Sequence, residues 1–501
     1  SDAMQNFVQP GPDLEKLVGL IAQSITLLHA QRGDDALRCL EEALCIAPDF
    51  PPALVKRGNV LQALSRHLEA IADFDRCLAL KSDMPHVREL RDAAVAAALA
   101  SYRPAPDVDA GNIDALNDMG NLLLRVNRHD DALACYEQIL AFAPDNAMAL
   151  FNRGNVLQQN ACYGAALSSY AAALAGRPGL PEVLIEQAHC RLAMGEFQAG
   201  WPLFEARWDT EQLRGAKLKT DAPLWCGEPL QDDADTDAVL LLWAEQGVGD
   251  TIQFARYLPL VALRAKNVMV RVPASLQTVI AASVNAPTLH VVDEREPLPL
   301  HTVHCPLMSL PLMFGTNLQS IPDDIPYLKT PDANTALWRA RLGERGKPRI
   351  GLVWAGGQRR LNNPTRDMPL AQLRPLLQHD AEWISLQKDL SGADLQTLAT
   401  MPSIRCVGNE LADFADTAAV IEQLDLVISV DSAVAHLAGA LGKPVWLMLR
   451  KSGEWRWMQG RSDSPWYPLH RLFRQQAHGE WGDVVQAIVR QLASFALPNQ
   501  G

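Results

Sequence analysis

The pattern of apolar and polar positions along the chain changes near Trp208. Before this residue, small and aromatic residues recur at wide and regular intervals. After it, short apolar runs alternate with segments of helical pattern. Regular recurrence indicates stacked helical units, and the alternation indicates strands separated by helices in a parallel sheet. The sequence therefore predicts a helical first half and an α/β second half.

The recurring positions of the first half are 34 residues apart. A small residue lets two antiparallel helices approach, and an aromatic ring fills the gap beside it. The residues that show the spacing are Gly120, Gly154, Ala188, Tyr136, Tyr170 and Phe204. This pattern resembles the tetratricopeptide repeat. It predicts a superhelix over 5–214, interrupted near 85–112, with units at 17–50, 51–84, 113–146, 147–180 and 181–214.

An asparagine follows the glycine of several units, at Asn59, Asn121 and Asn155. A side-chain amide both donates and accepts hydrogen bonds, so a ladder of asparagines can bind a peptide backbone with little sequence preference. We therefore expect a protein or peptide partner in the groove of the array. The alternative is that these asparagines are simply exposed residues of the repeat consensus.

Apolar runs at 238–243 and 349–354 each open a series of alternating strands and helices. The other predicted strands are 268–272, 289–293, 382–387, 404–407, 425–430 and 445–449. Two such series predict two Rossmann-like domains, over 222–340 and 346–498. Ligands of such domains bind beyond the carboxyl ends of the strands.

Composition and charge narrow the class of protein. The chain has 501 residues, of which 48% are hydrophobic, and a net charge of −13. The acidic balance argues against a nucleic-acid partner. No apolar run is long enough for a transmembrane segment. The nine cysteines form no CxxC pair, which is typical of reduced thiols in a cytoplasmic protein and gives no metal site.

Two segments place small and polar residues where a strand meets a helix. In the first, Gly247 and Gly249 let the backbone approach a ligand, and Asp250 is an acid at the helix start. In the second, Asp431 and Ser432 precede a helix whose first amides can hold a phosphate.

The order of these motifs resembles glycosyltransferase family 9, the heptosyltransferases. The resemblance covers about 200–490, and the tryptophan-rich stretch near its end resembles a subgroup with tetratricopeptide repeats in front. The segments that carry it are Gly249-Asp250, Asp431-Ser432, His436-Leu437-Ala438, Gly442-Lys443-Pro444, Trp455, Trp457, 463–468 and 204–208.

The resemblance implies a GT-B fold, with the acceptor on the first α/β domain and a nucleotide-sugar donor on the second. It also implies inversion at the anomeric carbon without a metal or other cofactor. Asp250 would be the general base, or alternatively only the cap of its helix. The donor and phosphate-binding residues would be Gly247, Gly249, Arg366, Lys388, Asp431, Ser432 and His436. His436 could instead be a buried histidine of the core.

Ala433 stands where heptosyltransferases commonly have glycine, and the −13 charge suits a lipopolysaccharide acceptor poorly. We therefore expect an inverting glycosyltransferase whose repeats recruit a polypeptide acceptor. One alternative is a protein-binding scaffold with an inactive transferase-like domain. Another is an enzyme with a glycolipid or saccharide acceptor.

Overall fold

The structure is a computed structural model of the whole chain. It describes residues 12–81, 83–103, 107–230, 237–245, 247–356, 367–452 and 454–495. These residues form two compact units, one up to Val156 and one from Leu157 onward. The boundary lies inside a helix of the repeats.

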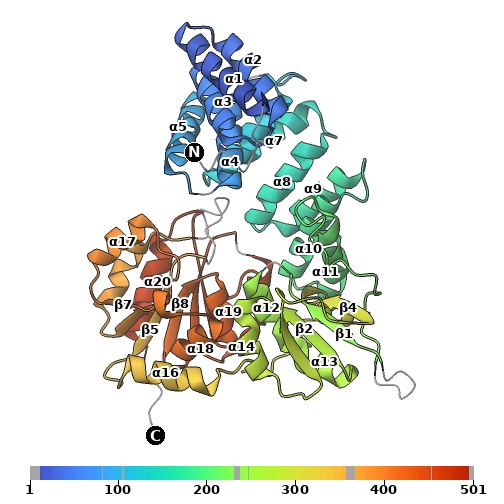
Figure 1. Cartoon of the computed structure of the whole chain (residues 1–501), viewed down its shortest axis with the longest axis vertical. Helices are drawn as coiled ribbons and strands as arrows, with labels where there is room; N and C mark the ends of the chain where they lie inside the picture. The colour runs from blue at the N-terminus through green and yellow to red at the C-terminus, as the bar shows by residue number, and fades with distance from the viewer. Residues whose placement is uncertain are drawn as a thin grey trace. The chain divides into compact units, whose positions relative to one another are not determined.

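The first half of the chain consists of helices joined by short turns (Figure 1), as the 34-residue spacing predicts. Each of the five predicted repeat units contains two helices. The helices are α1 (Pro12–His29), α2 (Gly33–Ile46), α3 (Pro51–Ala63), α4 (His67–Leu80), α5 (Pro85–Ser101), α6 (Ile113–Arg125), α7 (His129–Phe142), α8 (Ala147–Gln159), α9 (Tyr163–Leu174), α10 (Pro181–Ala193) and α11 (Phe197–Phe204). At the predicted interruption, α5 packs on α4 as an additional helix between two units.

The recurring glycines face aromatic rings. A Cβ atom on Gly58 of α3 would lie 2.5 Å from Cε1 of Phe74 on α4. A Cβ atom on Gly120 of α6 would lie 2.5 Å from Cε1 of Tyr136 on α7. Both rings are buried. The prediction that glycine makes room for a ring between two helices is confirmed in these two units.

The last repeat helices, α9 to α11, belong to the same compact unit as the α/β part. Trp201 of α11 is buried and donates a hydrogen bond from Nε1 to the Thr316 carbonyl at 3.0 Å. Its ring centroid lies 5.7 Å from that of Trp455 and 6.4 Å from that of Trp466. These rings hold α11, which lies inside the predicted repeat region 5–214, against the α/β part.

The α/β part contains two parallel sheets, which lie side by side in Figure 1. One has the order β3-β2-β1-β4, and the other has the order β10-β9-β8-β5-β6-β7. In the first, Leu240 pairs with Val268 and Val303, and in the second, Ile350 pairs with Leu426. The strands are β1 (Leu240–Trp243), β2 (Val268–Val272), β3 (Leu289–Asp293), β4 (Val303–Pro306), β5 (Arg349–Val353), β6 (Glu382–Ser385), β7 (Ile404–Cys406), β8 (Leu426–Val430), β9 (Val445–Leu449) and β10 (His470–Arg474).

Helices pack around both sheets, and α12 of the first domain contacts α19 of the second. The fold predicted from the sequence, helical repeats followed by parallel-sheet α/β domains, is confirmed. The helices are α12 (Val248–Phe254), α13 (Leu258–Arg264), α14 (Ala274–Ser283), α15 (Leu310–Met313), α16 (Asp332–Leu342), α17 (Gly392–Ala399), α18 (Phe414–Glu422), α19 (Ala433–Ala440) and α20 (Gly482–Ala493).

Candidate active site

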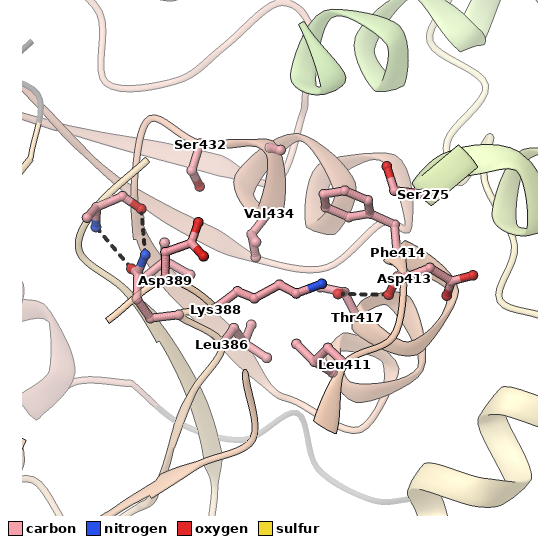
Figure 2. Close-up of a pocket in the computed structure, with 14 residues that line it drawn as sticks. Ser275, Leu386, Lys388, Asp389, Leu411, Asp413, Phe414, Thr417, Ser432 and Val434 are labelled. Atoms are coloured by element: carbon pink, nitrogen blue, oxygen red, sulfur yellow. Dashed lines mark hydrogen bonds between the residues drawn. The ribbon is translucent and has the colours of Figure 1, made fainter. Parts of the chain in front are cut away.

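A cleft with a cavity volume of about 130 Å³, partly open to solvent, lies at the carboxyl ends of β5, β6 and β8. The strand order of this sheet reverses between β5 and β8, the point at which open α/β sheets bind ligands. Ser275 of α14 also lines the cleft, so both α/β domains contribute to it. The cleft is shown in Figure 2, and its lining is Ser275, Val353, Ala355, Leu386, Gln387, Lys388, Asp389, Leu411, Asp413, Phe414, Thr417, Ser432, Ala433 and Val434.

One end of α19 gives the cleft its polar character. Ser432 caps this helix by accepting a hydrogen bond from the Ala435 amide at 3.3 Å. The amides of Ala433 and Val434 precede the first bond inside the helix, and both residues line the cleft. A helix start of this kind attracts anions because its free N–H groups carry partial positive charge.

A lysine, two aspartates (Asp389 and Asp413) and several apolar side chains complete the cleft. Lys388, which follows β6, is exposed, and Figure 2 shows its side chain extending toward Thr417. Leu386, Leu411 and Phe414 supply apolar surface. Cation, helix start and apolar wall together match the chemistry of a phosphorylated ligand with a flat or apolar group.

Asp250 lies in the first turn of α12, two residues after the helix starts. Its Oδ1 accepts a hydrogen bond from Nη2 of Arg456, which also bonds Glu454 and the Gln253 side chain. Burial raises the pKa of Glu454, although Arg456 opposes the rise. The pKa of Arg456 lies above its usual value because Asp250 and Glu454 outweigh the effect of burial.

The two glycines before Asp250 make room for protein atoms. A Cβ atom on Gly249 would lie 3.0 Å from Cδ2 of His436. Gly249 therefore lets α12 approach α19. A Cβ atom on Gly247 would lie 2.4 Å from Oδ2 of Asp250, so a side chain there would displace the carboxylate. The sequence predicted that these glycines let the backbone approach a ligand; in the structure the neighbouring atoms belong to His436 and Asp250, and the approach to a ligand stays a prediction.

His436 and Asp431 lie beside the cleft, outside its lining. His436 is buried, with Nδ1 hydrogen-bonded to the Tyr467 hydroxyl at 2.8 Å. Asp431 is also buried, and its Oδ2 accepts a hydrogen bond from Trp457 Nε1 at 3.1 Å. This geometry favours the alternative reading of His436 as a core histidine with its own partner.

The remaining candidate residues are dispersed. Arg366 lies outside the described residues. Asn59, Asn121 and Asn155 belong to the other compact unit. Asn121 is exposed and accepts a hydrogen bond from the Tyr136 hydroxyl, whereas Asn59 and Asn155 are half-buried. Their role in peptide binding stays a prediction.

Sequence reasoning missed Arg456, although it singled out the tryptophans on either side. An arginine between two tryptophans was the signal in the sequence that could have drawn attention to Arg456. The pairing of Arg456 with Asp250 gave no such signal, because the two residues are 206 positions apart. Among the described residues, no group of three or more histidine, cysteine, aspartate or glutamate side chains could hold a metal ion. No helix in the described ranges is long and apolar enough to cross a membrane.

Two family models match the chain. A tetratricopeptide repeat model matches residues 117–181, and the model of glycosyltransferase family 9 (heptosyltransferase) matches residues 411–458. The second match begins at the cleft wall, at Leu411, and includes Asp431, Ser432 and Arg456. Over these residues the chain is similar to tetratricopeptide repeats and to glycosyltransferase family 9.

Known proteins resemble either the whole chain or one of its parts. Protein FlbA of Caulobacter vibrioides is 24% identical over 527 residues, which cover 96% of this chain and 85% of FlbA. The heptosyltransferase II of E. coli, an ADP-heptose LPS enzyme, is 13% identical, with 51% of this chain and 97% of that one covered and a TM-score of 0.35. YrrB, a TPR protein with an unusual peptide-binding site, is 17% identical, with 39% and 87% covered and a TM-score of 0.22.

Proposed function

We propose that the chain is an inverting, metal-independent glycosyltransferase that transfers a sugar from a nucleotide-sugar. The observation that carries this proposal is the cleft at the switch point of the second sheet, between the start of α19 and Lys388. Several residues that line the cleft lie within the segment that matches glycosyltransferase family 9, and this overlap supports a sugar-transfer reaction.

In this proposal the donor diphosphate lies at the amides of Ala433 and Val434, with Lys388 as counter-charge. These groups stabilise the negative charge that develops on the leaving diphosphate. The apolar wall at Leu411 and Phe414 packs against the nucleoside. Gly247 and Gly249 are not among the residues that line the cleft, and in this proposal they let α12 pack and Asp250 take its place.

Asp250 then acts as the general base. The acceptor hydroxyl oxygen attacks the anomeric carbon from the face opposite the diphosphate, while the bond from that carbon to the phosphate oxygen breaks. Asp250 takes the hydroxyl proton, and the diphosphate leaves with the bonding electrons. A single displacement of this kind inverts the anomeric centre.

We propose a polypeptide acceptor, recruited by the repeats in the cytoplasm. Supporting this are the side-chain amides at Asn59, Asn121 and Asn155, which can bond a peptide backbone. A saccharide or glycolipid acceptor is the alternative for the same chemistry. A binding scaffold without turnover is the alternative from another class.

A thermal-shift screen against ADP, UDP, GDP and CMP and their sugar conjugates tests the donor site. A nucleotide at about 100 times its dissociation constant adds about 2.7 kcal/mol, which raises the melting temperature by roughly 2–4 °C. We expect one nucleotide to give this shift. We expect Lys388→Ala and Ser432→Ala to reduce it, whereas the exposed Lys451→Ala serves as the matched control.

If none of the nucleotides raises the melting temperature, the result contradicts the donor site and favours the scaffold.

If a shift is found, the nucleotide-sugar that gives it becomes the substrate in a nucleotide-release assay. Asp250→Asn is then expected to lower turnover by about 10²–10⁴-fold, because the amide cannot accept the proton. Unchanged turnover would remove Asp250 from the reaction.

A further inference from the structure

Arg456 is a buried arginine, and each of its three guanidinium nitrogens donates a hydrogen bond. It belongs to the short helical turn Trp455–Trp457, which follows β9 in the second α/β domain. Its Nε bonds the Gln253 side chain, Nη1 bonds Glu454 and Nη2 bonds Asp250. Its guanidinium carbon lies 4.5 Å from the ring centroid of Trp455. Such an arginine is fixed in position and direction.

The pairing leaves part of Asp250 accessible. The Asp250 side chain is 29% exposed, whereas that of Arg456 is 10% exposed. Arg456 bonds Oδ1, and Oδ2 lies toward the backbone of Gly247, where a Cβ atom would be 2.4 Å away. Because the Asp250 side chain is the more exposed of the two, an incoming ligand can reach it more readily than it can reach Arg456.

The charges around Arg456 keep it a cation. Asp250 and Glu454 both pair with it, and they hold its pKa above the usual value despite its burial. A general base must be ionised and aimed at the proton it removes. A charge-assisted hydrogen bond from a fixed guanidinium holds the Asp250 carboxylate in one direction.

Arg456 also joins parts of the chain that are distant in sequence. Asp250 and Gln253 lie on α12 of the first α/β domain, and Arg456 belongs to the second. The turn that carries Arg456 contacts α10 of the last repeat, where His189 interacts electrostatically with Glu454 and Arg456. The arginine thus fixes the carboxylate where both domains and the last repeat meet.

We propose that Arg456 is the positioning residue of the transferase: it holds the Asp250 carboxylate through Oδ1 and leaves Oδ2 to accept the acceptor proton. This inference rests on the proposed function, in which Asp250 is the base. Arg456 itself touches neither the donor nor the acceptor. Its effect on the reaction passes through Asp250.

The test uses the full chain and the release of nucleotide from UDP-glucose, GDP-mannose and ADP-glucose, with water as the acceptor. Arg456→Gln is expected to lower kcat about 10²-fold and to leave the nucleotide-induced melting shift unchanged. Arg456→Lys is expected to recover part of kcat, because it restores the charge without the planar fork. The matched control is Arg461→Gln, a more exposed arginine of the same loop that pairs with Asp463.

The double variant Asp250→Asn/Arg456→Gln separates positioning from general loss of structure. If Arg456 acts through Asp250, the double variant is no slower than Asp250→Asn alone. Additive losses would overturn the inference. The inference would also be overturned if Arg456→Gln had a normal kcat while Asp250→Asn was inactive.

A normal kcat in Asp250→Asn would instead contradict the proposed function itself. If Arg456→Gln fails to melt cooperatively, Arg456→Lys carries the test. Its kcat must then fall while its nucleotide-induced shift stays, and a wild-type kcat in this variant would overturn the inference.

Discussion

At the scale of single residues, burial decides which side chains keep their charge. His470 begins β10, is 3% exposed, and has no hydrogen-bond partner for either ring nitrogen among the described residues. Its ring stacks on Tyr467 with centroids 4.5 Å apart and on Trp457 with centroids 5.6 Å apart. Burial lowers its pKa to about 3, although Asp431 opposes this. The histidine is therefore neutral in the folded protein.

This neutral histidine predicts how stability depends on pH. Between about pH 6.5 and 3 the unfolded chain binds a proton at His470 that the folded chain does not, so stability falls as pH falls. The slope from this residue reaches about 1.4 kcal/mol per pH unit at most. We expect His470→Phe, which keeps an aromatic ring, to show a smaller loss of melting temperature between pH 7.5 and 5. Equal losses in both proteins would contradict this explanation.

At the scale of helices and strands, local patterns predicted most of the fold. The strands at 268–272, 289–293 and 445–449 were predicted with the bounds of β2, β3 and β9. The strands that the prediction missed, β4 and β10, lie at sheet edges. Edge strands carry polar residues that discourage further pairing, and β10 has the sequence HRLFR. Such a strand has no apolar run by which it could be recognised.

The glycine of a repeat helix offers a second prediction at this scale. Ala at Gly58 would place a Cβ atom 2.5 Å from a Phe74 ring that is 1% exposed, so the helices must move apart. We expect Gly58→Ala to destabilise the repeats by about 1–3 kcal/mol in urea unfolding. Ala at Gly19 of α1 meets no atom within 4 Å, and as a better helix former it should stabilise by about 0.5–1 kcal/mol. A similar effect of both substitutions would rule out the proposed steric cause.

At the scale of the whole molecule, the sequence predicted the order of repeat and α/β parts. It also predicted that Ser432 and Lys388 follow strand ends, where the structure places both in the cleft. It could not predict that Arg456 pairs with Asp250, because that contact depends on how two α/β domains pack. It also could not show that α10 and α11 pack with the α/β part, since their repeat pattern is the same as that of earlier units.

The boundary between the compact units gives a prediction about truncation. A chain that begins at Ala147 keeps α8 whole and the unit from Leu157 onward intact. We expect it to melt cooperatively and to keep the nucleotide-induced shift, but to lose transfer to a polypeptide acceptor. A chain that begins at Glu205 lacks α11 and exposes the rings of Trp455 and Trp466, so we expect it not to fold by circular dichroism. If the chain that begins at Ala147 still transfers sugar as fast as the full chain, the deleted repeats do not recruit the acceptor. This result would favour a saccharide acceptor.

The position of that boundary also bears on how such chains can diverge. In the unit before Leu157 most of the helix contacts join helices that are consecutive in sequence, so whole repeats can be gained or lost there at little cost to the rest of the chain. The helices after it are tied to Trp455 and Trp466 and must change together with them. A foreign repeat array should therefore be grafted within α8, where recognition can be exchanged while the α/β half retains its own last repeat.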